Sequence, residues 1–274
     1  METPSRLIRH QGKFPYGTTS ITSLHEEDPF VDTGMEFSIT VLPRGETTEI
    51  GGELETAMLL LGGEAEVKIG SLSVTIRRHS LFYDDPSCIH LPKGKTAQVF
   101  PLTDCEFACF RVENTKQFNP KVFLPQDMVE VEDRDKGKWD NTAWRIVKTI
   151  FDLRNRPNSM LVLGEVVALP GRWSSYPPHH HPQPEIYHYR FSAPQGYGHA
   201  ELGEDVFKVR SGDTLLILDS LDHSQVAAPG YAMYYIFAIR HLEGKPYITP
   251  EFTKEHLWLK EKDAKIPQIR RYDP

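Results

Sequence analysis

The sequence contains little cysteine and no long hydrophobic run. Its 274 residues include three cysteines, Cys88, Cys105 and Cys109. These are too few and too scattered for a disulfide framework, so we expect a reduced, cytoplasmic setting. The longest apolar runs, at 56–63 and 213–220, are much shorter than the roughly 20 residues that a membrane-spanning helix needs. Because the N-terminus also lacks the apolar stretch of a signal peptide, we expect a soluble protein with no membrane contact.

Positive charge is in deficit as well. The chain has 31 Lys and Arg residues against 38 Asp and Glu residues, which gives a formal net charge of −7. A protein that binds duplex nucleic acid needs a basic face to neutralise phosphates, so this balance argues against nucleic acid as a partner. In contrast, 39% of the residues are hydrophobic. At this length, that fraction is enough for the buried core of one large or two modest domains.

The sequence does contain a series of short strand patterns, punctuated by its 19 glycines and 21 prolines. The clearest is a hairpin in which 64–69 and 72–76 flank a Gly70-Ser71 turn. The other expected strands are 36–42, 80–83, 97–101, 106–112, 161–169, 185–191, 214–218 and 231–239. Many short strands with frequent turn signals predict an all-β fold, either a sandwich or a barrel. Beyond residue 249 we expect one short helix, capped by Thr253.

An internal repeat divides the chain in two. ITVLPRG at 39–45 matches EVVALPGR at 165–172, and HSLFYDDPSCIH at 79–90 matches GDTLLILDSLDH at 212–223. The agreement in order and spacing favours duplication over chance similarity between β segments. We therefore predict two tandem barrels joined by a charged, irregular linker. The predicted bounds are 1–124 for the N-terminal barrel, 125–158 for the linker and 159–274 for the C-terminal barrel.

Histidine is concentrated in one segment. Six of the twelve histidines fall between residues 179 and 223, and the segment begins with HHHPQPE at 179–185. His179 and His181 are two residues apart, so on a strand their side chains share one face. Glu185 returns to that face after a short irregular step, and His223 follows the strand pattern at 214–218. Three imidazoles and a carboxylate suit Zn²⁺, Mn²⁺, Fe²⁺ or Ni²⁺, and they leave a coordination position open for water or substrate.

The alternative is that these histidines are an accident of a polar surface. Prolines at 177, 178, 182 and 184 argue against it, because they stiffen the loop in one geometry. We therefore interpret His179, His181, Glu185 and His223 as metal ligands. His180 is expected to point to the opposite face of the strand.

The first half of the repeat lacks this set. Counting from Pro43 as from Pro170 puts Gly52, Leu54 and Met58 where His179, His181 and Glu185 would fall. In the same alignment His90 lies opposite His223. The N-terminal barrel is therefore predicted to be degenerate, keeping the fold without the metal.

The order of these residues resembles the two motifs of the cupin superfamily. The matching residues are Gly171, His179, His181, Glu185 and Gly196, followed by Gly212 and His223. Longer stretches resemble the 5-deoxy-glucuronate isomerases of myo-inositol catabolism. They are LVLGEVVALPGRWSSYPPHHH at 161–181, EIYHYRF at 185–191, PQGYG at 194–198 and AAPGYAMYYIFAIR at 227–240. The resemblance covers most of the chain.

This resemblance implies a bicupin that interconverts 5-deoxy-glucuronate and 2-deoxy-5-keto-gluconate. It also implies one divalent metal ion in the C-terminal barrel, preferably Zn²⁺, with Mn²⁺, Ni²⁺ or Fe²⁺ as alternatives. The chain departs from the family between His181 and Glu185, where it has only Pro-Gln-Pro in place of a longer acidic insertion. The related 5-keto-4-deoxyuronate isomerases therefore stay an alternative.

An aldose–ketose isomerase needs a general base and a means of holding its anionic substrate. A divalent metal can polarise the carbonyl and stabilise the enediolate. Our candidates for the base are Tyr187, Glu165 and Tyr235, and Arg172 and Arg190 are candidates for binding the substrate carboxylate. The competing interpretation is that Tyr187 is a packed core aromatic and that the arginines are exposed strand ends.

Two other functions use the same ligand set. One is a cupin Fe²⁺ dioxygenase, and the other is a non-catalytic sugar-binding bicupin in which the metal is a structural clip. In each case the expected partner is a small molecule, an anionic sugar for the isomerase. A homodimer that covers exposed sheet edges is a further expectation.

Overall fold

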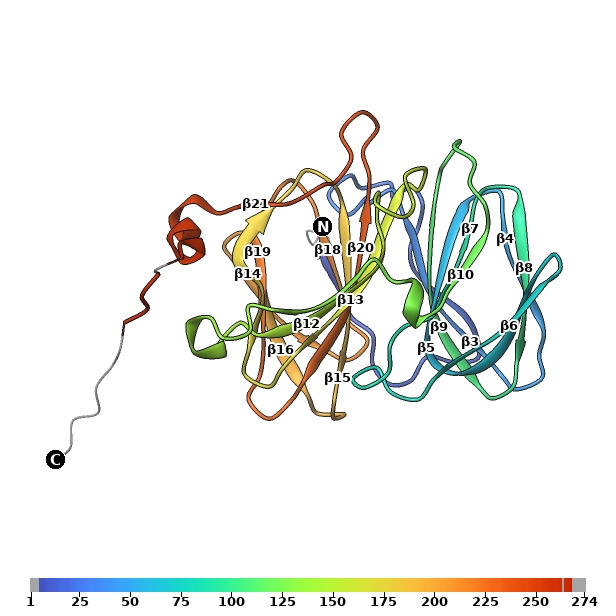
Figure 1. Cartoon of the computed structure of the whole chain (residues 1–274), viewed down its shortest axis with the longest axis horizontal. Helices are drawn as coiled ribbons and strands as arrows, with labels where there is room; N and C mark the ends of the chain where they lie inside the picture. The colour runs from blue at the N-terminus through green and yellow to red at the C-terminus, as the bar shows by residue number, and fades with distance from the viewer. Residues whose placement is uncertain (1–4, 263, 268–274) are drawn as a thin grey trace.

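The computed structural model describes residues 5–262 and 264–267, which form two β units side by side (Figure 1). The first unit is a nine-stranded sheet with the order β10-β7-β5-β9-β3-β2, to which β4, β6 and β8 attach. Its strands are β2 (Gly17–Thr22), β3 (Glu36–Leu42), β4 (Thr48–Gly52), β5 (Glu55–Ile69), β6 (Leu72–Arg78), β7 (Cys88–Leu91), β8 (Lys95–Pro101), β9 (Cys105–Val112) and β10 (Lys121–Phe123).

The second unit consists of two sheets. A seven-stranded sheet has the order β1-β18-β15-β20-β13-β12-β11, and a five-stranded sheet has the order β17-β16-β19-β14-β21. Their strands are β1 (Leu7–Ile8), β11 (Glu130–Arg134), β12 (Arg145–Phe151), β13 (Leu161–Ala168), β14 (Trp173–His180), β15 (Glu185–Phe191), β16 (Tyr197–Leu202), β17 (Asp205–Arg210), β18 (Thr214–Ile217), β19 (His223–Ala227), β20 (Met233–Arg240) and β21 (Glu251–Phe252). Three short 3₁₀ helices are η1 (Pro125–Asp127), η2 (Trp139–Asn141) and η3 (Lys254–Lys260). The all-β prediction is confirmed.

Most of the expected strands form, and the hairpin around Gly70-Ser71 is present as β5 and β6. The strand expected at 80–83 is wrong. The chain turns there instead, because the Asp84 carboxylate accepts hydrogen bonds from the backbone N–H groups of His79 and Ser80, at 2.7 and 3.0 Å. The expected C-terminal helix is the 3₁₀ helix η3. The Thr253 hydroxyl does not cap it but donates to the Pro178 carbonyl on β14.

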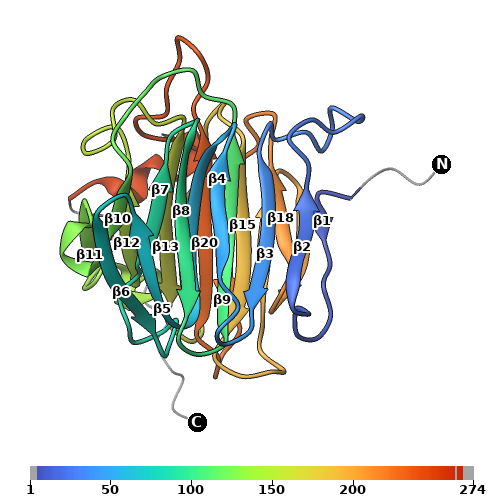
Figure 2. The same cartoon turned by 90° about the vertical axis from the view of Figure 1, so that its right-hand side faces the viewer.

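The segment 125–158 holds more regular structure than a linker. Its strands β11 and β12 pair with each other, and β12 pairs with β13, so the segment extends the seven-stranded sheet of the second unit. At the other edge of that sheet, β1 from the start of the described chain pairs with β18 (Figure 2). The seven-stranded sheet of the second unit therefore includes β1 from the predicted N-terminal block and β11 and β12 from the predicted linker.

The repeat alignment placed His90 opposite His223, and the strand pairing shows this to be wrong. His90 lies on β7, which pairs with β5 in the nine-stranded sheet, whereas His223 lies on β19 in the five-stranded sheet. His90 is fully buried, and its Nε2 is 2.8 Å from the Glu55 carboxylate. It is a core histidine with its own partner.

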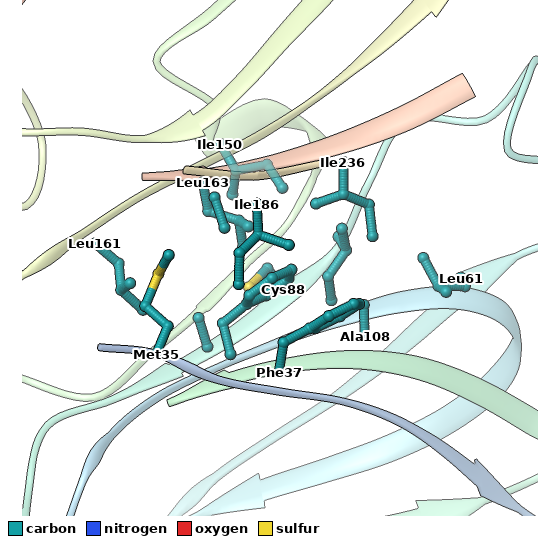
Figure 3. Close-up of a cluster of buried hydrophobic side chains, with 14 of the residues drawn as sticks. Met35, Phe37, Leu61, Cys88, Ala108, Ile150, Leu161, Leu163, Ile186 and Ile236 are labelled. Carbon is teal, nitrogen blue, oxygen red and sulfur yellow. The ribbon is translucent and has the colours of Figure 1, made fainter. Parts of the chain in front are cut away.

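Strand alternation divides the side chains of the large sheets between two environments. On β13 and β20, Leu161, Leu163 and Ile236 face the other unit, whereas Val166 and Tyr235 face the interior of their own barrel. The residues facing the other unit join those of β3, β5, β7 and β9 in one apolar cluster between the units (Figure 3). Because this cluster contains side chains from both halves of the chain, burial of its apolar surface holds the two units together.

A buried ion pair lies within the same interface. The Arg78 guanidinium at the end of β6 donates to both Glu165 oxygens on β13, at 2.8 and 2.6 Å, and both side chains are inaccessible to solvent. Tyr234 donates a further hydrogen bond to Glu165, and Lys148 lies 3.5 Å from it. Because two charges are buried here, each depends on the other for its stabilisation.

None of the helices in the described ranges has the length and apolar character that crossing a bilayer requires.

We expect Arg78→Met to lower the free energy of unfolding by about 3 kcal/mol, because it leaves the Glu165 carboxylate buried without its main partner. Urea denaturation at neutral pH measures the change. The matched control is Lys93→Met, which removes an exposed ion pair with Glu53 and should change stability by less than about 1 kcal/mol. An Arg78→Met loss no larger than that of the control would contradict the role given to this pair.

Candidate metal centre

Three of the four predicted ligands meet at one point inside the second barrel. His181, Glu185 and His223 each offer a ligand atom, and these atoms lie within 4.8 Å of one another. The three side chains are buried and come from the turn after β14, the start of β15 and the start of β19. The sequence brings them together because β14 pairs with β19, and β15 begins four residues after His181.

Backbone carbonyls set the direction in which the histidines point. His181 Nδ1 lies 2.9 Å from the Gln183 carbonyl, and His223 Nδ1 lies 3.2 Å from the Leu221 carbonyl. A carbonyl oxygen only accepts, so each Nδ1 carries a proton and donates it. In the neutral imidazole, Nε2 is then left with its lone pair. This is how metal-binding histidines are commonly held.

Both Nε2 atoms face the same carboxylate oxygen. The distances to Glu185 Oε2 are 3.1 Å from His181 and 3.4 Å from His223. His223 Nε2 is buried and has no hydrogen-bond partner among the described residues. Three acceptor atoms that converge without a proton between them repel one another unless a cation lies at their centre. The residues present therefore fit a divalent metal.

The charge state of Glu185 agrees with this fit. Burial alone would raise the pKa of the Glu185 carboxyl. His181 and His223 outweigh burial when they present an Nε2 proton to the carboxylate, and they lower its pKa to about 2; a cation bound between the three side chains would act in the same direction. The carboxylate is therefore ionised at neutral pH, the state that a metal ligand requires.

His179 lies beside this group and not within it. Its ring centroid is 4.5 Å from that of His223, and its Nδ1 is 3.3 Å from the Pro177 carbonyl. Burial and the neighbouring His223 lower the pKa of His179 well below its usual value, so its imidazole is neutral. His180, the middle residue of the run, instead pairs with Asp222 at 2.6 Å.

The histidine cluster opens into a cavity of about 690 Å³. Tyr187 and Tyr235, two of the residues proposed as bases, line it together with His179, His181 and Glu185. Burial raises the pKa of both tyrosines, so their hydroxyls are neutral at physiological pH. Neutral phenols donate hydrogen bonds, and a general base would have to be deprotonated.

Three other predicted site residues lie elsewhere. The side chains of Glu165 on β13 and Arg190 on β15 lie on the face of the sheet that is turned toward the first unit. Glu165 pairs with Arg78, and Arg190 pairs with Glu106 at 2.6 Å. Arg172 follows β13, its guanidinium has one long contact with the Asp140 carbonyl, and it does not line the cavity. The prediction of Glu165 as a candidate general base is therefore wrong, because alternation along β13 turns its side chain toward the first unit and away from the cavity.

Two features of the cavity were not anticipated from the sequence. The first is a network of buried hydroxyls centred on Ser175. The second is the ammonium group of Lys260, which lies on η3 and carries no motif that could have indicated it.

Lys260 differs from the other four basic side chains that line the cavity in having no acidic partner among the described residues. These four pair with acids that also line the cavity: Arg134 with Glu132, Lys138 and Arg145 with Asp135, and Arg154 with Glu130 and Asp152. Lys260 makes no ion pair within the described ranges, and its Nζ lies 3.3 Å from the centroid of the Phe252 ring. The same ring lies 5.7 Å from that of His179. The Phe252 ring thus lies between the Lys260 ammonium group and His179.

Comparisons with known proteins agree with this architecture. A model of the KduI/IolB family matches residues 7–259. A 5-deoxy-glucuronate isomerase from Geobacillus kaustophilus is 26% identical over 219 residues, which cover 73% of this chain and 77% of the relative. One from Geobacillus thermodenitrificans is 25% identical over 246 residues, which cover 82% and 86%.

Solved structures match the fold over nearly the whole chain. An IolB-like protein from Salmonella typhimurium has a TM-score of 0.79 at 21% identity, covering 93% of this chain and 99% of that one. Oxalate decarboxylase from Bacillus subtilis has a TM-score of 0.64 at 11% identity, covering 94% and 82%. At these identities the structures establish the fold, and they confirm the predicted bicupin. From its family match and its curated relatives, the chain belongs to the KduI/IolB family and is an isomerase of that family.

Proposed function

We propose that the protein is a metal-dependent aldose–ketose isomerase that interconverts 5-deoxy-glucuronate and 2-deoxy-5-keto-gluconate in myo-inositol degradation. The observation that carries the metal dependence is the convergence of the buried His181 and His223 Nε2 atoms on one oxygen of the Glu185 carboxylate. The curated relatives named 5-deoxy-glucuronate isomerase support the choice of reaction.

His181, Glu185 and His223 would hold the metal. We retain His179 as the proposed fourth ligand because its ring lies 4.5 Å from that of His223, although its ring nitrogens lie outside the three-residue group. Zn²⁺ is our first choice because imidazole and carboxylate ligands with an open position are typical of catalytic zinc, and Mn²⁺, Ni²⁺ and Fe²⁺ are alternatives. When bound, the metal would polarise the substrate carbonyl and its neighbouring hydroxyl. The buried walls of the cavity would exclude water from the reacting carbons.

The cavity also offers a contact for the substrate carboxylate. Lys260 replaces Arg172 and Arg190 as our candidate, because it lines the cavity and makes no ion pair within the described ranges. A uronate that reaches from the metal ligands toward η3 would bring its carboxylate to this ammonium group. A charge-assisted contact of this kind contributes about 1.5–3 kcal/mol.

We expect His181→Ala to remove the bound divalent metal and to lower kcat on 5-deoxy-glucuronate by about 10³-fold. The reason is that a Lewis acid lowers the activation free energy by several kcal/mol. Elemental analysis of the purified protein and an NMR assay of turnover measure the two effects. His180→Ala is the matched control, since it alters the same histidine run but pairs with Asp222 outside the centre. The control should keep both metal and activity.

Full turnover by a metal-free His181→Ala protein that is folded by circular dichroism would rule out the proposed mechanism. The same assay includes 5-keto-4-deoxyuronate as a second substrate. Preferential turnover of that compound would reject the proposed substrate and keep the reaction class.

We expect Lys260→Ala to raise KM for the anionic substrate about tenfold with little change in kcat, because the contact it removes is far from the reacting carbons. Steady-state kinetics of the metal-loaded enzyme give both constants. Lys254→Ala, on the same helix but not part of the cavity wall, serves as the control. Equal KM values for the two variants would show that Lys260 does not bind the carboxylate.

A further inference from the structure

Ser175 occupies a strained position in the cavity wall. Seven residues other than glycine have positive φ angles in the described ranges, and Ser175, with φ of 53°, is the one among them that is buried. An L residue in this left-handed region is less stable than glycine would be. Buried strain of this kind persists where the side chain serves a purpose that glycine cannot.

The strain coincides with an irregularity in β14. The pairing of β14 with β19 is regular at Ser174 and shifts register before His179. Such bulges redirect side chains and are frequent next to active sites. Here the shift turns the Ser175 hydroxyl into the cavity, between the strands that carry Tyr187 and Gln225.

The hydroxyl of Ser175 is the centre of a directional chain of hydrogen bonds. Tyr189 donates to Gln225 Oε1 at 2.7 Å, which orients the amide so that Gln225 Nε2 donates to Ser175 Oγ at 3.1 Å. Ser175 Oγ lies 3.1 Å from the Tyr187 hydroxyl and 3.3 Å from that of Tyr235. Gln225 occupies one of the two acceptor lone pairs of Ser175 Oγ, and the single Ser175 proton can be donated to the nearer phenol, Tyr187.

Tyr235 has a shorter contact than the one with Ser175. Its hydroxyl is 2.6 Å from Ser174 Oγ and 3.3 Å from Ser175 Oγ. Ser175 is the hydrogen-bond partner of the Tyr187 hydroxyl among the described residues. When Ser175 donates to Tyr187, the Tyr187 proton has no acceptor in the network and points into the cavity.

We infer that Ser175 is a positioning residue that directs the Tyr187 O–H group toward the substrate oxygen on which negative charge develops. Tyr187 then stabilises the enediolate as a hydrogen-bond donor, in place of the general base expected from its sequence position. The inference rests on the proposed isomerase function and assigns a role to a strained residue that binding the metal does not need. Donors of this kind act on the transition state, so their loss lowers kcat more than it alters KM.

A double-mutant cycle tests the inference. We expect Tyr187→Phe to lower kcat about 100-fold and Ser175→Ala about tenfold, with KM and bound metal unchanged in both. Since Ser175 acts through Tyr187, the double variant should be no slower than Tyr187→Phe alone. Losses that multiply in the double variant would overturn the inference.

Ser175→Gly separates the hydroxyl from the backbone strain. Its kcat should fall as far as that of Ser175→Ala. It should unfold at a higher temperature than Ser175→Ala, because glycine adopts the positive φ angle without strain. Ser220→Gly is the matched control, with φ of 54° at an exposed position outside the cavity, and it should keep its kcat. Full kcat in Ser175→Gly would overturn the inference.

The wild-type holoenzyme distinguishes this inference from the proposed function. Absence of turnover on any uronate defeats both together. Turnover by the wild type with independent losses in the cycle defeats the role of Ser175 alone.

Discussion

His181 and His223 each give their Nδ1 proton to a backbone carbonyl, and this fixes what their Nε2 atoms can do. Both Nε2 atoms face one oxygen of the Glu185 carboxylate in a space that is nearly free of solvent. With both imidazoles neutral, the two Nε2 lone pairs and the carboxylate oxygen repel one another. A divalent cation bound between them would be attracted to all three. The register of β14 against β19 and the short turn before Glu185 are the features of the fold that bring these atoms together.

Strand β15 of the second barrel contributes side chains both to the site and to the contact with the first unit. Strand alternation sends Glu185, Tyr187 and Tyr189 into the barrel, and it sends Ile186 and His188 toward the first unit. One strand therefore supplies both the site and the interface between units. The large apolar cluster and the Arg78–Glu165 pair pack against the face of the seven-stranded sheet that is turned toward the first unit. They therefore support β15, the strand that carries Glu185. This division gives the first barrel a structural role that requires no metal ligands of its own.

Much of this could be predicted from the sequence, and the errors have a common cause. The strand periodicity and the repeat led to the all-β bicupin, because these signals are local. The HHHPQPE segment led to His179, His181, Glu185 and His223 as predicted ligands, three of which the structure brings together. Glu165 and Arg190 were wrongly assigned to the site because bulges and strand register decide which face of the sheet a side chain occupies. Neither bulges nor register can be read from the composition. Lys260 and Ser175 carried no local signal: one depends on where a distant 3₁₀ helix docks, and the other on a positive φ angle.

X-ray absorption at the edge of the metal that copurifies with the protein tests the central claim most directly. The account predicts one metal equivalent per chain, surrounded by imidazole nitrogen and carboxylate oxygen at about 2.0–2.2 Å. It also predicts that the imidazole scattering weakens when His181 is replaced by alanine and is retained when His180 is replaced. An active wild-type protein that contains no metal, or a metal without imidazole ligands, would contradict it.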